Sequence, residues 1–333
     1  YQERIKQVDI LKNIGFYTLS DKRAATASLK SPLMRTELIL TNKCNFKCGY
    51  CRGLRKEIDS ELPFKKAEEV VNYWLSEDLK NIRFSGGEPT LYPGLVELVK
   101  KCKASGVEHI AVSSNGSATW DTYRELIKAG VNDFSISLDS CCASVGDKMA
   151  GGITGAWETV TSNIKKISRK VYTTVGIVIN EENLSTCANT VKLADKLGVS
   201  DIRVIPSAQY NRMLKSMEEI PYKLIKKYPI LEYRYRNLRG GHPVRGLQKR
   251  DSHRCWLMID DMAVAGNYHF PCIIYMREKG DPVGEVGPNM RYERLKWILK
   301  HNTFDDKICR ENCLDVCIDH NNRVRDFCVN RLP

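Results

Sequence analysis

Three cysteines that lie close together near the start of the chain are the residues most able to do chemistry. Cys44, Cys48 and Cys51 have the spacing C-x3-C-x2-C. Thiolates hold iron–sulfur clusters, and a [4Fe–4S] cluster usually has four of them. Three protein thiolates leave one iron open to a substrate or cofactor, as an open position does in a catalytic zinc site. The spacing therefore predicts a reactive iron–sulfur centre in this segment.

A structural zinc site is the alternative use of these cysteines. Zinc in such sites takes four closed protein ligands, most often in paired C-x2-C or Cys/His spacings. Only Cys48 and Cys51 have that spacing, and no fourth Cys or His lies near them in the sequence. The pattern therefore favours iron over zinc.

The elements that must position these cysteines alternate between strand-like and helix-like runs. Apolar and β-branched runs predict strands, and apolar residues at helical spacing predict the helices between them. The expected strands are 36–40, 82–84, 110–112, 134–138, 173–179 and 202–205. Alternation of this kind implies right-handed βαβ units and a parallel sheet, with the chemistry at the carboxyl ends of the strands. We therefore expect an α/β fold, a partial (β/α)6 TIM-like barrel.

Other candidate binding residues follow the later strands. The run from Gly86 to Pro89 comes directly after the second strand, where two glycines allow backbone to approach a ligand closely. Further polar residues end the next strands: Ser113, Ser114, Asn115, Ser137, Asp139 and Asn180. Ser, Asn and Asp also favour caps and turns, so both roles remain open for each of them.

The cysteine spacing, Tyr50 before the last cysteine and the Gly86-Gly87-Glu88-Pro89 run together resemble the radical S-adenosylmethionine (SAM) superfamily. The resemblance covers roughly residues 36–206, half of the chain. It implies a [4Fe–4S] cluster whose open iron binds the amino and carboxylate groups of SAM. Reductive cleavage of SAM would then give a 5′-deoxyadenosyl radical that abstracts hydrogen from a substrate.

The resemblance also assigns residues and partners. It implies that Cys44, Cys48 and Cys51 hold the cluster, and it implies an electron donor such as a flavodoxin or ferredoxin. The residues expected to contact SAM are Gly86, Gly87, Glu88, Ser114, Asn115, Ser137 and Asn180.

A second group of six cysteines lies near the end of the chain: Cys255, Cys272, Cys309, Cys313, Cys317 and Cys328. It resembles the SPASM and Twitch auxiliary-cluster extensions of the same superfamily, but a full SPASM pattern has seven cysteines, so one auxiliary [4Fe–4S] cluster is favoured over two. Cys255 and Cys272 are expected on a hairpin of residues 258–265 and 268–274. We expect Cys313 and Cys317 to complete the site, with Cys309 and Cys328 as alternates and His320 as a further candidate. Structural zinc remains an alternative here, because four protein ligands close a site.

Positive charge is concentrated in one tyrosine-rich segment. The chain has a net charge of +12, and residues 207–250 hold eleven Lys or Arg against three acids. Such a segment suits a nucleic acid or nucleotide, an acidic peptide, a phosphorylated small molecule, or a solvated connection. Within it, Arg234 and Arg236 alternate with tyrosines and would share one face if this run were a strand.

The remaining features bound the class of protein. We find no apolar run long enough to span a membrane and no signal peptide, so we expect a cytoplasmic protein without membrane contact. Cysteines at metal-ligand spacings argue against a disulfide framework. We divide the chain into an N-terminal extension (1–35), a radical SAM partial barrel (36–206), a basic connecting segment (207–254) and an auxiliary cluster domain (255–333).

The leading hypothesis is a radical SAM enzyme that abstracts hydrogen from an anionic substrate, with a nucleoside, nucleotide or nucleic acid favoured by the basic segment. The close alternative is a radical SAM enzyme that matures a ribosomally made peptide or protein. A hypothesis of another class is a non-catalytic, zinc-stabilised nucleic-acid-binding protein, supported by the positive charge and the cysteine count.

Overall fold

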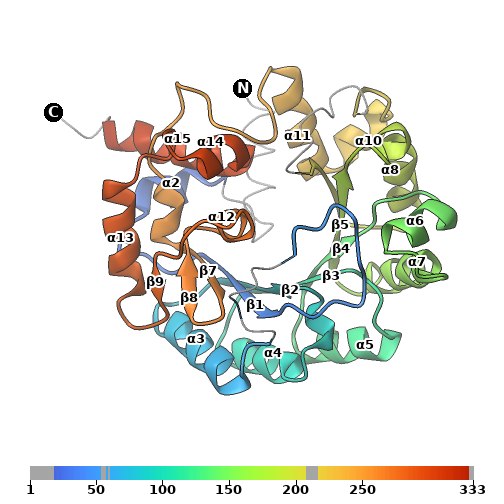
Figure 1. Ribbon diagram of the computed structural model, residues 1–333, viewed down its shortest axis with the longest axis horizontal. Helices are drawn as coiled ribbons and strands as arrows, with labels where there is room; N and C mark the ends of the chain where they lie inside the picture. The colour runs from blue at the N-terminus through green and yellow to red at the C-terminus, as the bar shows by residue number, and fades with distance from the viewer. Residues whose placement is uncertain (1–18, 54–57, 59–60, 208–216, 330–333) are drawn as a thin grey trace.

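The computed structural model describes residues 19–53, 58, 61–207 and 217–329. Its centre is a curved sheet with strand order β6-β5-β4-β3-β2-β1-β7-β8-β9, and Figure 1 looks down its hollow side. The first six strands are β1 (Arg35–Thr41), β2 (Asn81–Gly86), β3 (His109–Ser114), β4 (Asp133–Ser137), β5 (Tyr172–Ile179) and β6 (Asp201–Pro206). Neighbours among these six pair in parallel. The predicted α/β partial barrel is thus confirmed, and its sheet stays open.

Helices cover the outer face of this sheet, as Figure 1 shows. They are α3 (Phe64–Ser76), α4 (Leu95–Ala104), α5 (Trp120–Ala129), α6 (Ala143–Met149), α7 (Ala156–Ile167) and α8 (Cys187–Lys196). In α3, Ala67, Val70, Val71 and Trp74 are buried at helical spacing, so a single apolar stripe faces the sheet. The sequence missed only α6 in this part of the chain, because that helix is short and its one buried residue is Met149.

The two faces of the strands differ in character. Alternate residues such as Ile82, Phe84 and Val204 belong to the main apolar core under the helices. The residues between them point to the opposite face, because side chains alternate along a strand. That inner face carries charged residues such as Arg83 and Arg203. The interior of the barrel is therefore polar and lined by residues that can bind a polar ligand.

The C-terminal segment extends the same sheet, which the sequence did not predict. Strand β7 (Asp261–Ala265) pairs in parallel with β1, and β8 (Tyr268–Phe270) and β9 (Gly284–Glu285) follow in antiparallel order. The hairpin expected between Cys255 and Cys272 is present as β7 and β8. Its ends differ from expectation, because residues 256–259 form the short 3-10 helix η3 (Trp256–Ile259) and residues 273–277 form helix α12 (Ile273–Arg277).

The basic segment is largely helical, with α10 (Tyr222–Lys227) and α11 (Pro229–Arg239), while residues 208–216 lie outside the described part. The alternating Tyr and Arg residues suggested a strand as one reading, and that reading is wrong. Helix α11 begins with a proline at its first turn, where the missing N–H costs nothing. As a result Arg234 is buried at 1% exposure whereas Arg236 faces solvent, so the two do not share a face.

Short helices complete the fold around the C-terminal cysteines: α2 (Asp21–Thr26), α13 (Met290–Lys300), α14 (Lys307–Asn312) and α15 (Asp315–Val329), with the 3-10 turns η1 (Pro89–Leu91) and η2 (Leu184–Thr186) elsewhere. Helix α15 lies against α2 and η3, so the start and the end of the described chain pack together (Figure 1). Among the helices that the structure describes, none combines the length and apolar character needed to cross a membrane.

Candidate active site and thiol groups

The cysteine loop, residues 42–53, leaves the carboxyl end of β1 and is clamped against the turn that follows β2. The Gly87 N–H donates to Thr41 O at 2.7 Å, and the Glu88 N–H donates to Lys43 O at 2.8 Å. A Cβ atom on Gly86 would lie 2.4 Å from Thr41 O, and one on Gly87 would lie 2.3 Å from Lys43 O. The two glycines therefore permit close approach to the cysteine loop itself, and these two N–H groups are used in that contact.

The three thiols of the cysteine loop lie close enough to affect one another's ionisation. Cys44 and Cys51 are exposed and Cys48 is partly buried. The backbone N–H of Phe46 lies 3.4 Å from Cys44 Sγ, and that of Gly53 lies 3.4 Å from Cys51 Sγ. Such N–H···S bonds stabilise thiolates and tune iron–sulfur clusters. The donor set therefore fits a [4Fe–4S] cluster.

Burial and neighbouring charge raise the pKa of Cys44 and Cys48, so these two thiols are held protonated when nothing binds them. Burial raises the pKa of Cys48 to about 12, with the carboxylate of Asp139 acting in the same direction. For Cys44 burial is again the main cause of a raised pKa, and the Glu88 carboxylate adds to it. Metal binding requires thiolates, so a bound metal would release protons here.

Glu88 joins the turn after β2 to the end of β3. Its side chain is 0% exposed, and its carboxylate accepts hydrogen bonds from the Ser114 hydroxyl at 2.9 Å and the Asn115 N–H at 2.7 Å. It also accepts from the N–H and hydroxyl of Thr90. Burial raises the pKa of Glu88, and these donors oppose that shift. The carboxylate is thus fully engaged in shaping the rim.

Asn115 carries this network to the cysteine loop. Its side-chain amide donates to Asn45 Oδ1 at 2.9 Å and lies 3.9 Å from Cys44 Sγ. Three residues predicted to contact the cofactor, Glu88, Ser114 and Asn115, are therefore brought together beside the first cysteine.

Two other predicted contacts do not join that network. Ser137 is exposed at the end of β4. Asn180 follows β5, where its side chain accepts from the Glu182 N–H at 2.9 Å and its N–H donates to Asn183. These are the contacts of a turn, the second role that its residue type allowed.

Three further side chains complete the rim. The hydroxyl of Tyr50 donates to Asp139, whose carboxylate also accepts from the Val178 N–H at 2.7 Å. From the C-terminal segment, Arg277 donates to Gly53 O at 3.2 Å and to Gly86 O at 3.1 Å. Tyr50, next to Cys51, and Asp139, at the end of a predicted strand, both gave a signal in the sequence, whereas nothing near Arg277 indicated its contact.

The second cysteine group gathers around one point. Five of its thiols affect one another's ionisation: Cys255, Cys272, Cys309, Cys313 and Cys317, which we call the C-terminal thiol group. All five are partly buried, and burial is the main cause of their raised pKa values. The four expected ligands are thus together with one of the two alternates. The other alternate, Cys328, belongs to α15, but its side chain lies outside the described part.

Two side chains beside Cys309 were missed by the sequence analysis. His301, Asp306 and Cys309 place potential ligand atoms within 4.8 Å of one another, a spacing that can hold a metal ion. The Tyr275 hydroxyl donates to Asp306 at 2.8 Å, so the carboxylate is held in position. His320, also a candidate, is fully buried in α15.

Arg294 bonds to the backbone next to two members of the C-terminal thiol group, Cys255 and Cys272. Its buried guanidinium donates to four backbone carbonyls, those of Met258, Asp261, Phe270 and Pro271, at 2.6 to 3.0 Å. The segments that carry Cys255 and Cys272 are therefore tied to one cationic side chain.

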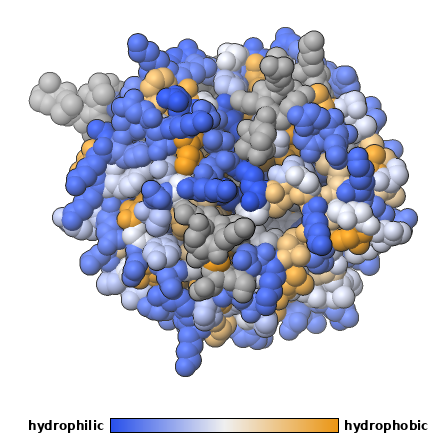
Figure 2. Space-filling view, viewed as in Figure 1, coloured by the Kyte–Doolittle hydropathy of each residue, from blue (hydrophilic) through white to orange (hydrophobic). Residues whose placement is uncertain are grey.

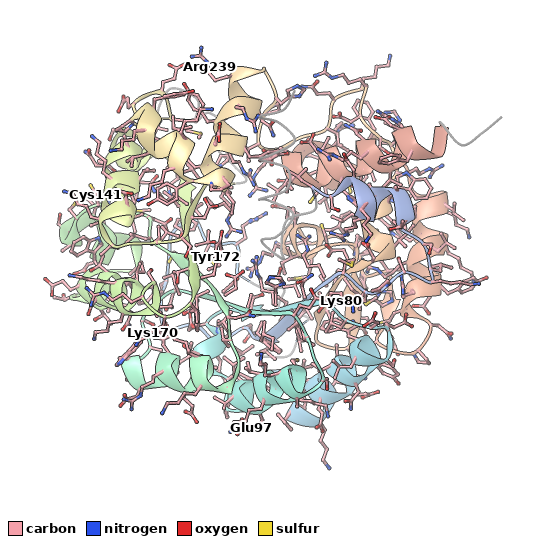
Figure 3. The ribbon with its side chains drawn as sticks, turned by 180° about the vertical axis from the view of Figure 1, so that it is seen from behind. Lys80, Glu97, Cys141, Lys170, Tyr172 and Arg239 are labelled. Atoms are coloured by element: carbon pink, nitrogen blue, oxygen red, sulfur yellow. The ribbon has the colours of Figure 1, made fainter. Side chains whose placement is uncertain are left out.

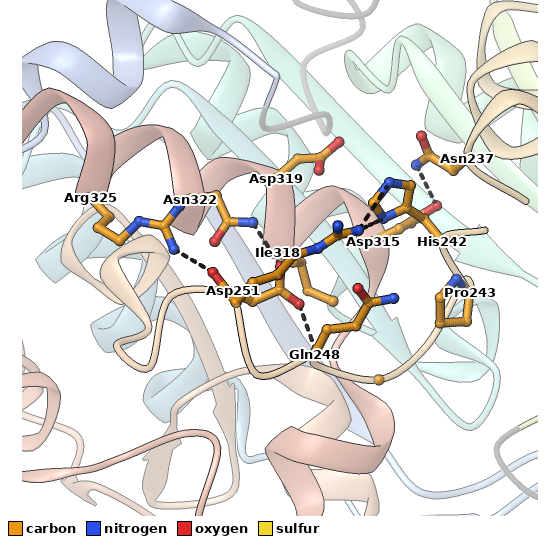
Figure 4. Close-up of a pocket in the computed structure, with 12 residues that line it drawn as sticks. Asn237, His242, Pro243, Gln248, Asp251, Asp315, Ile318, Asp319, Asn322 and Arg325 are labelled. Atoms are coloured by element: carbon orange, nitrogen blue, oxygen red, sulfur yellow. Dashed lines mark hydrogen bonds between the residues drawn. The ribbon is translucent and has the colours of Figure 1, made fainter. Parts of the chain in front are cut away.

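A small cavity of about 140 Å³ lies between α11, α15 and the loop that joins α11 to η3. Figure 4 shows that its polar side chains are bonded to one another. Asp251 accepts from the Gln248 N–H at 2.7 Å and from Asn322 at 3.0 Å, and Arg250 lies 3.3 Å from His242. Near the barrel opening, Figure 2 shows a mostly hydrophilic face around a central hollow. We take that opening, rather than this cavity, as the candidate active site.

Comparison with known proteins gives a family for the barrel. Residues 38–194 match the radical SAM superfamily. A probable GTP 3′,8-cyclase from Saccharolobus solfataricus is 29% identical over 52% of this chain and 57% of its own length. A GTP 3′,8-cyclase from Synechococcus elongatus is 33% identical over 32% of this chain and 34% of its own length. The match thus spans little more than half the length of the first of these relatives and about a third of the second.

Two solved structures share the fold over most of the chain. Streptococcus suis SuiB bound to its precursor peptide SuiA superimposes with a TM-score of 0.58 at 14% identity, over 90% of this chain and 79% of SuiB. The protein anSMEcpe with bound AdoMet gives a TM-score of 0.56 at 16% identity, over 89% of this chain and 97% of its own.

Proposed function

Residues 38–194 belong to the radical SAM superfamily, and on that premise we propose that Cys44, Cys48 and Cys51 hold a [4Fe–4S] cluster that binds SAM. The observation that carries the proposal is a loop of three interacting thiols, with N–H donors to two of them, at the carboxyl end of β1. A cluster held by these cysteines would pass one electron from an external donor to SAM, and the cleavage would give methionine and a 5′-deoxyadenosyl radical able to take a hydrogen atom from the substrate.

The surrounding residues position the cysteine loop and shape the space for SAM. Gly86 and Gly87 fix the loop against β2, and Glu88 and Asn115 fix it against β3. We infer that the Gly86–Glu88 turn, Ser114 and Asn115 border the bound SAM, with Ser137 and Asn180 further along the rim. Tyr50 and Arg277 tie the end of the loop to its neighbours and so restrict its movement.

We further propose that the C-terminal thiol group holds one auxiliary [4Fe–4S] cluster. Its convergent, partly buried thiols support this reading. Cys255, Cys272, Cys313 and Cys317 are the proposed ligands. Cys309 lies with them and also with His301 and Asp306, so it is the fifth thiol of the site. A flavodoxin or ferredoxin is the expected electron donor.

For the substrate we propose an anionic molecule, with a nucleoside or nucleotide favoured. The charged interior of the barrel and the curated relatives named as GTP 3′,8-cyclases support this choice. A peptide substrate is the alternative. SuiB, one of the structures that share the fold, is bound to a precursor peptide, but the likeness to SuiB and anSMEcpe concerns the fold alone.

The test is reconstitution of the full chain with iron and sulfide under anaerobic conditions. We expect about eight irons per chain for two clusters, or about four if the auxiliary site stays empty. With SAM and dithionite, the protein should form 5′-deoxyadenosine, measured by liquid chromatography and mass spectrometry. Stoichiometric zinc without iron would instead support the zinc-stabilised nucleic-acid-binding protein.

Candidate substrates are separated by the same assay. The proposed class is supported by a nucleotide that increases 5′-deoxyadenosine formation. When that nucleotide is labelled with deuterium, the label should appear in 5′-deoxyadenosine. Stimulation by a peptide and not by nucleotides would replace that class while leaving the radical chemistry intact.

A further inference from the structure

A histidine, an aspartate and a cysteine converge at the turn between α13 and α14. His301 directly follows α13, Asp306 directly precedes α14, and Cys309 lies in the first turn of α14. Each offers one potential ligand atom, and the three atoms lie within 4.8 Å of one another. Zinc binds imidazole, carboxylate and thiolate at about 2.0–2.3 Å, so atoms with this spacing can share one ion.

His301 and Asp306 are close together without forming an ordinary hydrogen-bonded pair. His301 Nε2 lies 3.1 Å from Asp306 Oδ2. Nε2 is buried, yet it forms no hydrogen bond with any residue that the structure describes, so the two atoms are near but not aligned for one. Two ligands of one metal ion are arranged in this way, because each directs its lone pair at the ion and not at the other ligand. A buried nitrogen without a partner is also costly, and an ion would satisfy it.

Neighbouring side chains hold both of these groups in place. The Trp297 ring stacks on the His301 ring, with the centroids 3.8 Å apart and 20° between the planes. Asp306 Oδ2 accepts from the Tyr275 hydroxyl at 2.8 Å, and Oδ1 accepts from the Cys309 N–H at 2.9 Å. Each carboxylate oxygen has a further lone pair, so Asp306 can still coordinate a metal. Metal ligands are commonly oriented by outer contacts of this kind.

The group also has access to solvent and a thiol that the proposed clusters do not use. His301 and residues of α13 line a cavity of about 320 Å³. The side chains of His301 and Asp306 are partly exposed, so an ion and a water ligand can reach them from outside. The four thiols proposed as ligands of the auxiliary cluster leave Cys309 available.

We propose that His301, Asp306 and Cys309 bind one zinc ion, with water as the fourth ligand. A mixed nitrogen, oxygen and sulfur set suits zinc, whereas magnesium and calcium prefer oxygen ligands alone. The Cys309 thiol gives its proton to solvent when the ion binds. The ion joins the end of α13 to the start of α14, and so fixes the turn that leads into the C-terminal thiol group. This site goes beyond the proposed function and is separate from both proposed clusters.

The experiment measures the metals bound to the full chain after anaerobic reconstitution with iron and sulfide. Zinc is added, unbound metal is removed, and both metals are measured by inductively coupled plasma mass spectrometry. We expect about one zinc per chain in addition to the iron of the clusters. Zinc K-edge X-ray absorption should show one sulfur neighbour at about 2.3 Å, with nitrogen and oxygen neighbours at about 2.0–2.2 Å.

Two variants test the nitrogen and oxygen ligands. His301→Phe keeps a ring to stack on Trp297 but removes the nitrogen. It should weaken zinc binding about 100-fold or more, since even the loss of an outer contact to a metal ligand costs about 10–100-fold. His253→Phe is the matched control, because His253 also stacks on an aromatic ring, that of Phe304, and should bind zinc as the wild type does. Asp306→Asn keeps an acceptor for the helix cap and is also expected to bind zinc more weakly.

A third variant tests the thiol. Cys309→Ser should lose the zinc and keep the iron. Cys141→Ser is its control and should keep both metals. Cys141 is likewise partly buried, and Figure 3 shows it on the opposite side of the molecule from the C-terminal helices.

Each outcome decides the matter. Absence of zinc from the wild type, or wild-type zinc affinity in His301→Phe, would overturn the proposal. Four sulfur neighbours in the zinc spectrum would also overturn it, because the zinc would then lie among the C-terminal thiols. Loss of about four irons in Cys309→Ser would assign Cys309 to the auxiliary cluster, with the same consequence. If His301→Phe lowers the melting temperature strongly, Asp306→Asn and the wild-type spectrum decide.

Discussion

The cysteine loop and the C-terminal thiol group differ most in the charges beside their sulfurs. In the cysteine loop the charged side chains that shift the thiols of Cys44 and Cys48 are carboxylates, Glu88 for Cys44 and Asp139 for Cys48. Both carboxylates raise the pKa of the thiol beside them. Two of the three thiols are also exposed to the barrel opening.

In the C-terminal thiol group the protein supplies cations as well as acids: Asp261 raises the pKa of Cys272 and Cys317 and Asp306 raises that of Cys309, but cations oppose this shift at three of the thiols. Arg35 opposes the effect of burial on the pKa of Cys272 and Cys317, and Arg294 does so for Cys255. A site with acidic neighbours and an open side suits a cationic ligand such as the sulfonium of SAM. A site whose thiolates face the protein's own cations suits a closed cluster. The two groups of cysteines therefore suit different sites: the cysteine loop suits a cluster with an exchangeable ligand, and the C-terminal thiol group suits a cluster held by protein ligands only.

Removal of one thiol from each group is expected to have the largest effect, and it tests this difference most directly. Cys48→Ala is expected to abolish 5′-deoxyadenosine formation and to lose about four irons per chain, because two thiols cannot hold the reactive cluster. Cys313→Ala should lose a similar amount of iron from the other group while the cysteine loop keeps its own. Iron analysis together with product formation measures both effects.

The reciprocal result would contradict the assignment. If Cys48→Ala retained SAM cleavage, the reactive cluster would lie elsewhere. If Cys313→Ala kept full iron, Cys309 would be the ligand in its place, which Cys309→Ala in the same assay would show.

The next largest effect is expected for Arg294, the buried cation beside the C-terminal thiol group. Arg294→Met removes the donor to four buried carbonyls, and we expect the free energy of unfolding to fall by about 3–5 kcal/mol. Urea denaturation of the reconstituted protein measures this loss. Lys300→Met on the exposed side of the same helix is the control and should change little. Equal stability of Arg294→Met and wild type would show that other residues hold the backbone segments that carry Cys255 and Cys272.

A smaller effect is expected at the carboxylate beside the cysteine loop. In Glu88→Gln one acceptor oxygen becomes an NH₂ group, which only donates, so the side chain can no longer accept from both Ser114 and Asn115. A buried hydrogen bond lost in this way costs about 1–3 kcal/mol. Urea denaturation gives the value, and Glu97→Gln on the exposed face of α4 serves as the control. A change confined to SAM affinity, with stability intact, would make Glu88 a ligand rather than a support.

The sequence predicted the barrel and the cysteine loop because both depend on local patterns. Runs of β-branched and apolar residues marked the six strands, and the cysteines directly follow the first of them. The pairing of β7 with β1 and the contact of Arg277 with the Gly86 carbonyl could not be predicted, since each joins segments far apart in the chain. Tyr-Arg alternation in α11 misled us because tertiary pairing buries Arg234 against Asp315.

The smallest predicted effect tests whether burial or neighbouring positive charge decides the ionisation of a carboxyl group, Asp133, at the start of β4. Burial raises the pKa of Asp133 to about 6, although Arg83 and Arg203 act to lower it. An acid whose pKa is higher in the folded than in the unfolded state stabilises the fold at low pH and loses that contribution as pH rises through 6. With an unfolded pKa of about 3.9, the free energy of unfolding should fall by about 1 kcal/mol between pH 5 and pH 7. Asp133→Asn should remove this part of the pH dependence, measured by urea denaturation at both pH values. If Asp133→Asn leaves the pH dependence unchanged, the two guanidiniums already keep the Asp133 carboxylate ionised. Neighbouring positive charge would then outweigh burial at Asp133, whereas burial dominates at the cysteines.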